Sequence, residues 1–381
     1  MRIAVLGGIA QSLVNFRGQF LSALVRRGHE VHTIAGEESV DVRKQLAALG
    51  VWFHPIQLRR STISPFHDVA TILALARVFR RWRADMLFSY TIKPVVYGSI
   101  VARLTGVSRC FSLITGLGYC FMDGSLMRKA LNFLVRLLYR LALPLNEVVF
   151  FQNPDDKRLF VNLGLLGSRG RAVVVDGSGV DLKYFAEAPL PLKPVRFLLV
   201  ARLIREKGIC EYLEAARKLK RKHVEASFRL VGPEDAGRSS IPKTQLAAIR
   251  REGIVDYLGE VKDVRSAIAD ASVCVLPSYR EGLPRSVVEA MAMGRPVITT
   301  DVPGCRETVS PGVNGFLIPS RDSELLANAM ERFVRDPDLV VQMGRRSREI
   351  AVSRFDVDRI NALMLQEMGL VEVQTRLAIA K

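Results

Sequence analysis

Short hydrophobic runs alternate with segments of helical periodicity along most of the chain. In the first half the runs are RIAVLG, HEVHTIAG, VWFHPIQL, ADMLFSY and RCFSLITG, and EVVFFQN and RAVVVDGSGVD continue the series. Uninterrupted apolar runs are typical of strands that are buried on both faces, and strand–helix alternation is typical of a parallel sheet covered by helices. The first half is therefore predicted to be an α/β domain.

A second series of the same kind follows a proline-rich stretch. Residues 186–195, AEAPLPLKPV, contain three prolines and are predicted to form a linker. Beyond them VRFLLVAR, ASFRLVG, VDYLG, SVCVLPS, PVITTD and GFLIP alternate with helical segments. We expect two Rossmann-like α/β domains, 1–185 and 196–355, that face a central cleft. A C-terminal helix within 356–381 is expected to cross back to the first domain.

The charge of the chain indicates an anionic partner. The net charge is +17, and residues 1–185 carry 24 Lys and Arg against 12 Asp and Glu, which gives +12 for the first half. Nucleic acid, a membrane surface and a phosphorylated substrate all fit such a charge. Nucleic acid is disfavoured because the sequence has no aromatic-rich basic face and no recognised nucleic-acid module.

One basic segment has the pattern of a membrane-surface helix. Residues 125–145, SLMRKALNFLVRLLYRLALPL, contain no acidic residue, and Lys129, Asn132, Arg136 and Arg140 recur at helical spacing among leucines. Such a helix can lie on an anionic bilayer, although an ordinary amphipathic helix with a solvated basic face has the same pattern. No stretch reaches the roughly 18 apolar residues that a spanning helix needs.

The start of the chain and its cysteines favour a cytoplasmic location. The first apolar run breaks at Gly7-Gly8 and no cleavage-like site follows, so it does not resemble a signal peptide. The five cysteines are scattered, with no metal-binding spacing, as in a cytosolic protein with reduced thiols.

Two glutamates stand out in EGLPRSVVEAMAMG, residues 281–294. Pro284 suits the first position of a helix and Gly294 its end, which places Glu281 at the helix N-terminus and Glu289 about two turns further on. Unpaired N–H groups of a first helical turn attract anions and polar ligands. One ligand could reach both carboxylates. The alternative is an exposed Glu281 and a helix-surface Glu289 that make ordinary ion pairs.

A pair of cations strengthens the case for a ligand site. VARLIREKG, residues 200–208, follows a predicted strand and opens a helix, so Arg202 and Lys207 lie in a loop at the carboxyl edge of the second sheet. Arginine and lysine can together neutralise a diphosphate leaving group. The sequence has no Asp-x-Asp and no histidine cluster, so no metal ligand is proposed and the two cations would take the role of a metal ion.

These motifs resemble those of a known family. ARLIREKG, LVGPED, YLGEV, VLPSYREGLPRSVVEAMAMGRPVITTD and VNGFLI, in this order, resemble the family-4 retaining glycosyltransferases of GT-B fold. In the first half YTIKPVVYGSIVARLTGV and ITGLGYCF are similar to bacterial enzymes that extend undecaprenyl-diphosphate-linked glycans. Within that group the resemblance points to N-acetylgalactosaminyltransferases and to O-antigen and capsule relatives.

The resemblance implies roles on the donor side. Arg202 and Lys207 would hold the donor diphosphate, Glu281 would contact the sugar hydroxyls near the reacting carbon, and Glu289 would bind the ribose. The remaining donor contacts implied are the backbone of Gly282, Leu283 and the neighbours of Pro284 for sugar and phosphate, Gly232, Pro233 and Val261 for the base, and Gly7 and Gly8 for close approach to the diphosphate. No cofactor is implied, since the UDP-sugar is a substrate.

On the acceptor side the sequence offers fewer candidate residues than on the donor side. Many family members carry a histidine in the loop after the fifth strand, but this chain has Thr115-Gly116-Leu117-Gly118 there and offers no general base. For a retaining enzyme, the resemblance then implies front-face displacement, in which the departing diphosphate helps to remove the acceptor proton. Candidate acceptor contacts are Tyr90, Lys93, Thr115, Gly116 and Tyr119, and candidate membrane contacts are Lys129, Arg136 and Arg140.

Together with the motifs, the resemblance implies a metal-independent, retaining enzyme that moves a sugar from a UDP-sugar to a polyprenyl-diphosphate-linked saccharide. An N-acetylhexosamine is the favoured sugar, with GalNAc first, and the expected location is the cytoplasmic face of the inner membrane. A UDP-sugar epimerase of the same fold and a non-catalytic, membrane-associated partner subunit remain as alternatives. The epimerase would need acid/base groups clustered at the sugar, and the partner subunit would predict decayed motifs.

Overall fold

The computed structural model describes residues 1–37, 39–58, 65–117, 121, 126–167, 170–237 and 239–370. The chain forms two compact units. Unit 1 consists of residues 1–178 together with the C-terminal segment from Asp358, and unit 2 consists of residues 179–357.

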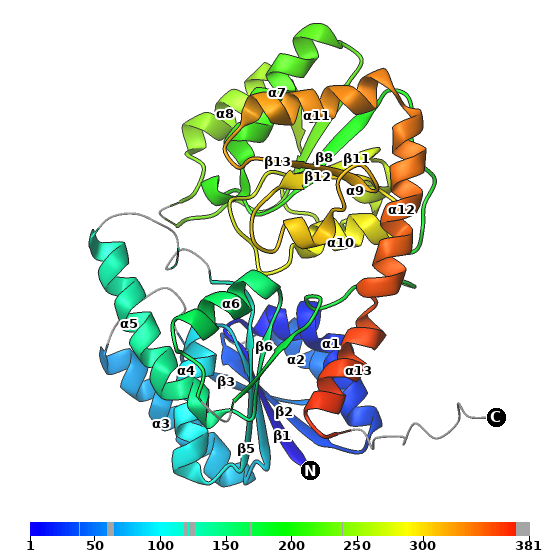
Figure 1. The fold of residues 1–381 in the computed structure, drawn as a ribbon. Helices are drawn as coiled ribbons and strands as arrows, with labels where there is room; N and C mark the ends of the chain where they lie inside the picture. Colours follow the sequence, from blue (N-terminus) through cyan, green and yellow to red (C-terminus); the bar gives the residue numbers. More distant parts are fainter. Residues whose placement is uncertain are drawn as a thin grey trace, which may run out of the picture. The chain divides into compact units, whose positions relative to one another are not determined.

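Unit 1 is built on a parallel sheet. Among its described residues, seven strands lie in the order β3-β2-β1-β4-β5-β6-β7 (Figure 1). The strands are β1 (Arg2–Leu6), β2 (Glu30–Gly36), β3 (Trp52–Ile56), β4 (Met86–Tyr90), β5 (Arg109–Ile114), β6 (Val148–Phe151) and β7 (Arg171–Val174). The chain order reverses between β1 and β4, so the carboxyl ends of these two strands form the switch point where ligands bind in such sheets.

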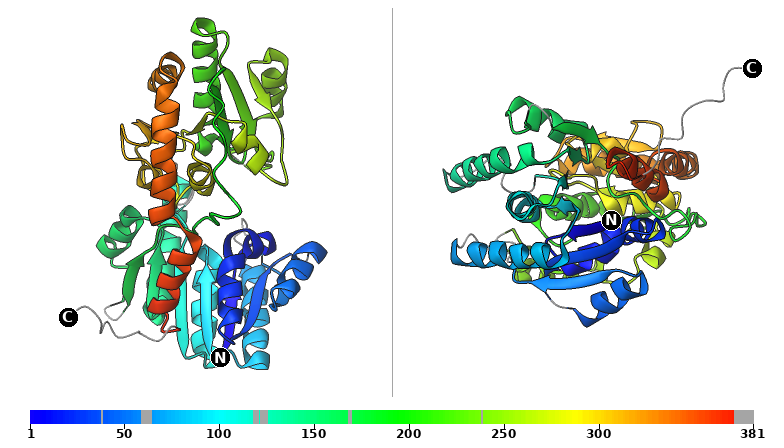
Figure 2. Two further views of the ribbon diagram at one scale, coloured as in Figure 1. Left: turned by 90° about the vertical axis from the view of Figure 1, so that its right-hand side faces the viewer. Right: turned by 90° about the horizontal axis from the view of Figure 1, so that it is seen from below.

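Helices cover both faces of this sheet, as the uninterrupted apolar strands predict. One core lies under α1, α2 and α13 and contains Phe20, Phe88 and Met364. The opposite face of the sheet packs against α3 to α6 (Figures 1 and 2). Two hydrophobic clusters lie there, one with Leu75 and the other with Tyr139. The helices are α1 (Ala10–Arg26), α2 (Val40–Ala48), α3 (Pro65–Trp82), α4 (Ile92–Thr105), α5 (Leu126–Ala142), α6 (Pro154–Asn162) and α13 (Val357–Glu367).

Unit 2 repeats the plan. Its described residues form a six-stranded parallel sheet in the order β10-β9-β8-β11-β12-β13, with the reversal between β8 and β11. The strands are β8 (Arg196–Val200), β9 (Ser227–Val231), β10 (Val255–Tyr257), β11 (Val273–Leu276), β12 (Val297–Thr300) and β13 (Gly315–Ile318). The helices are α7 (Ile209–Lys222), α8 (Lys243–Glu252), α9 (Arg265–Ala269), α10 (Arg285–Ala292), α11 (Ser323–Arg335) and α12 (Asp338–Arg354). The sheet lies between one core under α7, α8 and α11 and another under α9, α10 and α12.

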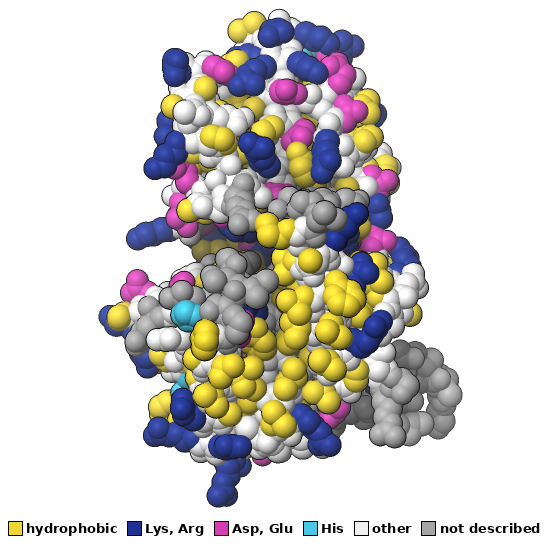
Figure 3. Space-filling model, turned by 90° about the vertical axis from the view of Figure 1, so that its left-hand side faces the viewer, with side chains coloured by type: hydrophobic (Ala, Val, Ile, Leu, Met, Phe, Trp, Pro, Cys, Tyr) yellow, Lys and Arg dark blue, Asp and Glu magenta, His cyan; other side chains and the backbone are white. Residues whose placement is uncertain are grey.

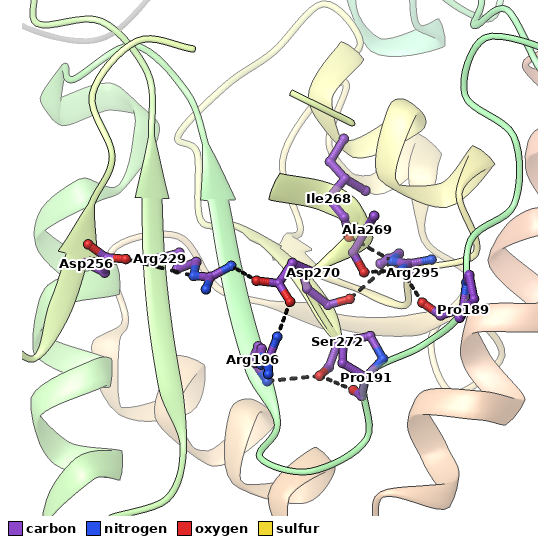
Figure 4. Close-up of polar contacts among 11 residues, drawn as sticks. Pro189, Pro191, Arg196, Arg229, Asp256, Ile268, Ala269, Asp270, Ser272 and Arg295 are labelled. Atoms are coloured by element: carbon purple, nitrogen blue, oxygen red, sulfur yellow. Dashed lines mark hydrogen bonds and ion pairs between the residues drawn. The ribbon is translucent and has the colours of Figure 1, made fainter. Parts of the chain in front are cut away.

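The proline-rich stretch 186–195 belongs to unit 2 and does not lie between the units. The fully buried Arg295 donates a hydrogen bond to the Pro189 carbonyl (2.6 Å), and the Ser272 hydroxyl donates to the Pro191 carbonyl (2.5 Å; Figure 4). Proline has no N–H, so its segment cannot join the sheet by donating, and its carbonyls are bound by side chains instead. The prolines predict a linker between the two domains, whereas residues 186–195 belong to unit 2, and nothing in the sequence indicates that Arg295 binds this segment.

The chain returns to unit 1 near its C-terminus. Ile360 and Met364 of α13 lie in the unit 1 core, and Glu367 pairs with Arg171 at 2.7 Å. The first unit ends at Ser178, a few residues before the sequence-based boundary at 185, and residues 371–381 of the expected 356–381 segment lie outside the described residues. No helix in the part of the chain that the structure describes has the length and apolarity needed to span a bilayer.

Candidate active site

The switch point of unit 2 brings Lys207 and Glu281 together. Lys207 lies in the turn Arg205–Lys207 that follows β8, and Glu281 lies in the loop that follows β11. Because β8 and β11 are parallel neighbours, both loops leave the same edge of the sheet. The Lys207 ammonium is in direct contact with Glu281 Oε1, with the side chains 22% and 12% exposed. Lysine and glutamate therefore form a partly buried ion pair at the position where the sequence predicts a diphosphate and a sugar.

Ser278 holds the same carboxylate in place. Its hydroxyl lies 2.7 Å from Glu281 Oε1, and the residue is fully buried. Backbone contacts fix the loop as well, because the N–H of Glu281 donates to the Pro303 carbonyl at 3.1 Å. Glu281 is thus held from three sides. Sequence reasoning did not identify Ser278; the available signal is a hydroxyl three residues before the glutamate at a strand end.

Two glycines let the loops approach this closely. Gly208 has φ +72° and a Cβ there would overlap the Pro277 carbonyl; Gly304 has φ +81° and a Cβ there would overlap the Glu281 and Gly282 carbonyls. Glycine is required at both positions for two reasons: the backbone is left-handed, and there is no room for a Cβ. The geometry around Glu281 therefore depends on glycines from two other loops.

Helix α10 carries Glu289 with a partner of its own. Arg285 Nε donates to Glu289 Oε1 at 2.7 Å, and the Glu289 side chain is only 12% exposed. Burial raises the pKa of Glu289 above its usual value, and the nearby Arg285 guanidinium opposes that rise. Glu289 thus makes an ordinary i,i+4 ion pair, as the alternative interpretation expects, but its side chain is largely buried. The helix begins at Arg285, one residue later than predicted, so Pro284 is its N-cap residue.

The other donor-side residues lie on neighbouring loops of the same sheet edge. Arg202 does not join the Lys207–Glu281 pair; its half-exposed side chain pairs with Asp235 at 3.0 Å. Gly232 has φ +145° and a Cβ there would overlap the Ala201 carbonyl, so this glycine allows the loops after β8 and β9 to touch. Pro233, Val261 and Leu283 are partly buried, and Gly282 and Pro284 are buried. The sequence did not indicate Asp235 or Arg285, because their relation to the site becomes visible only through their ion pairs with Arg202 and Glu289.

Gly7 and Gly8 lie at the switch point of unit 1. The structure there shows that the prediction for Tyr90 was wrong. Tyr90 is 2% exposed, its hydroxyl lies 2.8 Å from Ser12 Oγ, and burial raises its pKa to about 12. A Cβ on Gly7 would overlap that hydroxyl. Tyr90 is thus a core residue that does not face an acceptor. Gly7 makes room for Tyr90, which differs from the predicted reason, close approach to a diphosphate.

The other acceptor candidates lie along the same edge. Gly8 approaches Thr91, Lys93 lies in the first turn of α4, and Thr115 and Gly116 follow β5. These positions leave the carboxyl ends of the neighbouring strands β1, β4 and β5, so the structure brings them to one region of unit 1. Tyr119 lies outside the described residues.

Helix α5 exposes Arg140 and leaves Arg136 half-buried, and both side chains have partners that the sequence did not indicate. Arg140 donates to the Leu163 carbonyl at 2.7 Å, and Arg136 lies over the Phe121 ring, so both side chains contact unit 1 itself. Lys129 is exposed. The helix also exposes an apolar stripe that consists of Met127, Phe133, Leu134, Leu137 and Leu141. Within the described residues, no three His, Cys, Asp or Glu side chains are grouped as metal ligands would be.

Comparison with known families covers both units. Residues 14–176 match the family model "Glycosyl transferase 4-like domain", and residues 194–336 match "Glycosyl transferases group 1". The second match contains Arg202, Lys207, Glu281 and Glu289. The two matches together span most of the chain.

Curated relatives and a solved structure agree with these matches. The chain is 27% identical to the N,N'-diacetylbacillosaminyl-diphospho-undecaprenol alpha-1,3-N-acetylgalactosaminyltransferase of Campylobacter jejuni, over 92% of this chain and 94% of that protein. It is 25% identical to the UDP-Gal:alpha-D-GlcNAc-diphosphoundecaprenol alpha-1,3-galactosyltransferase of Escherichia coli, over 80% and 81%. The structure of Anabaena HepE in complex with UDP has a TM-score of 0.77 at 19% identity and covers 97% of this chain and 100% of that one, which shows the fold.

Proposed function

Because the chain belongs to the group 1 glycosyltransferases, with a GT-B fold of two Rossmann-like units, we propose that it transfers a sugar from a UDP-sugar to a polyprenyl-diphosphate-linked saccharide. The observation that carries the proposal is the Lys207–Glu281 pair at the unit 2 switch point, with Glu289 on the adjoining helix. The names of the two relatives support a diphospho-undecaprenol acceptor, and the name of the Escherichia coli relative supports a UDP donor. GalNAc is the favoured sugar because the Campylobacter relative is named for it.

The charges of the site suit departure of a nucleoside diphosphate. In the proposed complex the diphosphate binds between Arg202 and Lys207, the sugar hydroxyls bind Glu281, and the ribose hydroxyls bind Glu289. Lys207 exchanges part of its contact with Glu281 for a phosphate oxygen. A cation that is already held in a partly buried site stabilises developing negative charge without reorganisation.

The proposed reaction retains the configuration at the anomeric carbon. The bond from that carbon to the β-phosphate oxygen breaks, and the acceptor oxygen forms its bond on the same face. The acceptor proton passes to the departing phosphate oxygen, so the step balances without a separate base. Arg202 and Lys207 supply the positive charge that a metal ion supplies in other transferases, and transfer is expected to continue in EDTA.

The surface of unit 1 supports contact with a lipid bilayer. Exposed apolar side chains of α5 include Phe133 (72%), Leu137 (44%) and Leu141 (58%), and Figure 3 shows hydrophobic side chains gathered on this face with Lys and Arg at its edges. Unpartnered apolar surface with a basic margin is typical of proteins that bind anionic membranes. We place the protein at the cytoplasmic face of the inner membrane, in assembly of a surface polysaccharide or glycan.

Acceptor-dependent UDP release tests this function. Purified protein is incubated with UDP-GalNAc, UDP-GlcNAc or UDP-Glc, with and without a short-chain polyprenyl-diphosphate-sugar. Release from one donor that requires the acceptor, and that is lost in Lys207→Ala and Glu281→Ala, is the expected result. UDP binding without turnover across a broad panel would contradict the proposal and favour a non-catalytic partner.

A further inference from the structure

Three polar side chains on α3 and α4 form a cluster outside the donor site. Lys93 Nζ lies 2.7 Å from Asp68 Oδ1, with the two side chains 17% and 18% exposed. Tyr97 donates its hydroxyl hydrogen bond to the same carboxylate, and burial together with Asp68 raises the pKa of Tyr97 to about 12. Lys93 Nζ also lies 5.9 Å from the centre of the Tyr97 ring. Asp68, Lys93 and Tyr97, hereafter the Lys93 cluster, thus hold an ammonium group in one place.

The cluster lies at the end of unit 1 where a substrate of a GT-B enzyme is expected. Lys93 is the second residue of α4, directly after β4 at the switch point. The preceding Thr91 has φ +71° and ψ 159°, a conformation that is unfavourable for a non-glycine residue and persists only where the surrounding structure imposes it. The surrounding structure therefore fixes the start of α4, and with it the position of Lys93.

An independent feature of the same helix pair points to a lipid. Phe66, Val69 and Leu73 of α3 are 88%, 55% and 50% exposed and follow each other at helical spacing. Asp68 lies among them in sequence but turns toward α4, where it meets Lys93. The exposed apolar face of α3 therefore lies beside a cation on α4, Lys93, which Asp68 holds in place. A ligand that matches both has an apolar chain and an anionic head.

We propose that the Lys93 cluster binds the diphosphate of the lipid-linked acceptor, with the prenyl chain against the exposed face of α3. The inference rests on the proposed function and adds the subsite that recognises the diphosphate. Lysine is a mobile point charge that suits phosphate oxygens, and Asp68 keeps its ammonium oriented until the diphosphate binds. Because the acceptor sugar is bonded directly to that diphosphate, this contact positions the reacting hydroxyl at the carboxyl edge of unit 1.

Binding of farnesyl diphosphate tests the subsite without requiring turnover. Calorimetry compares wild type with Lys93→Met, Lys93→Arg and, as a matched control, Lys44→Met, which alters an exposed lysine on α2. We expect Lys93→Met to weaken farnesyl diphosphate binding by about tenfold or more, because it removes a charged hydrogen-bond donor to the diphosphate. Lys93→Arg and Lys44→Met should bind nearly as wild type, and UDP affinity should be unchanged in all three.

A double variant separates recognition from an uncompensated charge. Lys93→Met leaves Asp68 without its cation, and that carboxylate would itself repel a diphosphate. Lys93→Met/Asp68→Asn removes the repulsion and should still bind farnesyl diphosphate weakly. Recovery of wild-type affinity in the double variant would overturn the proposal, as would an equal loss of affinity for farnesol, which lacks phosphate. Because binding of farnesyl diphosphate requires no sugar transfer, and UDP affinity is measured separately, failure of the subsite leaves the proposed transferase activity standing.

Discussion

Lys207 and Glu281, 74 residues apart in the chain, form an ion pair at the carboxyl edge of the unit 2 sheet. The pair joins the loop after β8 to the loop after β11, and Ser278 binds the same carboxylate oxygen at 2.7 Å. A site that is already assembled and charged can stabilise a departing diphosphate without first rearranging.

Replacing Lys207 tests the role of this cation. Lys207→Ala should lower kcat by about 10²–10³-fold, because removal of one preorganised charge-stabilising group has an effect of that size. Steady-state rates with a saturating donor provide the measurement, and Lys243→Ala, an exposed lysine of α8, is the control. A Lys207→Ala enzyme with an unchanged kcat would show that the ammonium does not act on the leaving group.

Replacing Ser278 tests whether Glu281 must be held. Ser278→Ala should lower kcat by about tenfold and leave the KM for donor nearly unchanged, since the hydroxyl positions a carboxylate that acts in transfer. Ser323→Ala, which removes a surface hydroxyl bonded to Glu214 at 2.7 Å, is the matched control. A rise in KM alone would mean that Ser278 supports donor binding only.

Glu289 predicts a pH dependence of donor binding. Burial raises the pKa of this carboxyl above its usual 4.5, and ribose hydroxyls bind the ionised form best. UDP affinity should therefore rise as the pH is raised through that elevated pKa, and Glu289→Gln should bind more weakly without this dependence. Titration calorimetry across the acidic range measures both, and an identical pH profile for the two proteins would contradict the assignment.

Ionised Glu289 is expected to favour donor binding and to lower the stability of the fold. An acid whose pKa is raised by folding costs stability when it ionises, so the cost is absent below the unfolded pKa and fully present above the folded one. Glu289→Gln should therefore unfold at a higher temperature than wild type near neutral pH, by about 2–4 °C for each kcal/mol recovered in a unit of this size. The gain should disappear in acid, and thermal unfolding at several pH values measures it. A variant less stable than wild type at neutral pH would show that the Arg285 contact outweighs burial.

Gly208 tests the close approach of the two loops. Gly208→Ala should destabilise the protein by about 2 kcal/mol or more, because its Cβ would overlap the Pro277 carbonyl in addition to the strain of φ +72°. Gly312→Ala is the control, since Gly312 also has a positive φ but meets nothing within 4 Å and should lose only about 1 kcal/mol. Urea unfolding provides the comparison, and equal losses would show that the overlap relaxes freely.

The apolar face of α5 predicts membrane binding. Leu137→Asn/Leu141→Asn should weaken binding to phosphatidylglycerol-containing vesicles by about tenfold or more, since it removes apolar surface that the bilayer would cover. Val224→Asn, which alters an exposed apolar residue of unit 2, is the control. Vesicle sedimentation measures the effect, and equal binding by all three proteins would place the contact elsewhere.

The sequence predicted the architecture well because buried parallel strands leave a strong local signal. The apolar runs ending at Leu6 and Leu276 are strands, and Lys207 and Glu281 could be placed at one sheet edge because each follows such a run. Their pairing could not be predicted, since it depends on which strands become neighbours. Asp68 was missed for the same reason: nothing near it in the sequence indicates that Lys93 will be its partner.

The sequence also did not predict the direction in which side chains point at the ends of strands. Tyr90 ends a strand at the expected edge, but its ring turns into the core beside Ser12, and the sequence pattern does not distinguish the two directions. The sequence placed Arg140 on an exposed basic face of α5, where it lies, but could not predict that its guanidinium also reaches the Leu163 carbonyl.

The most direct test of the proposed activity is the mass and anomeric configuration of the lipid product. Purified protein, a UDP-sugar and a polyprenyl-diphosphate-sugar are incubated, and the extracted lipid is analysed by mass spectrometry and NMR. We predict an acceptor that is heavier by one sugar residue, joined with the anomeric configuration of the donor. Unmodified acceptor, together with a donor that has been epimerised or left intact, would contradict the assignment as a glycosyltransferase of lipid-linked sugars.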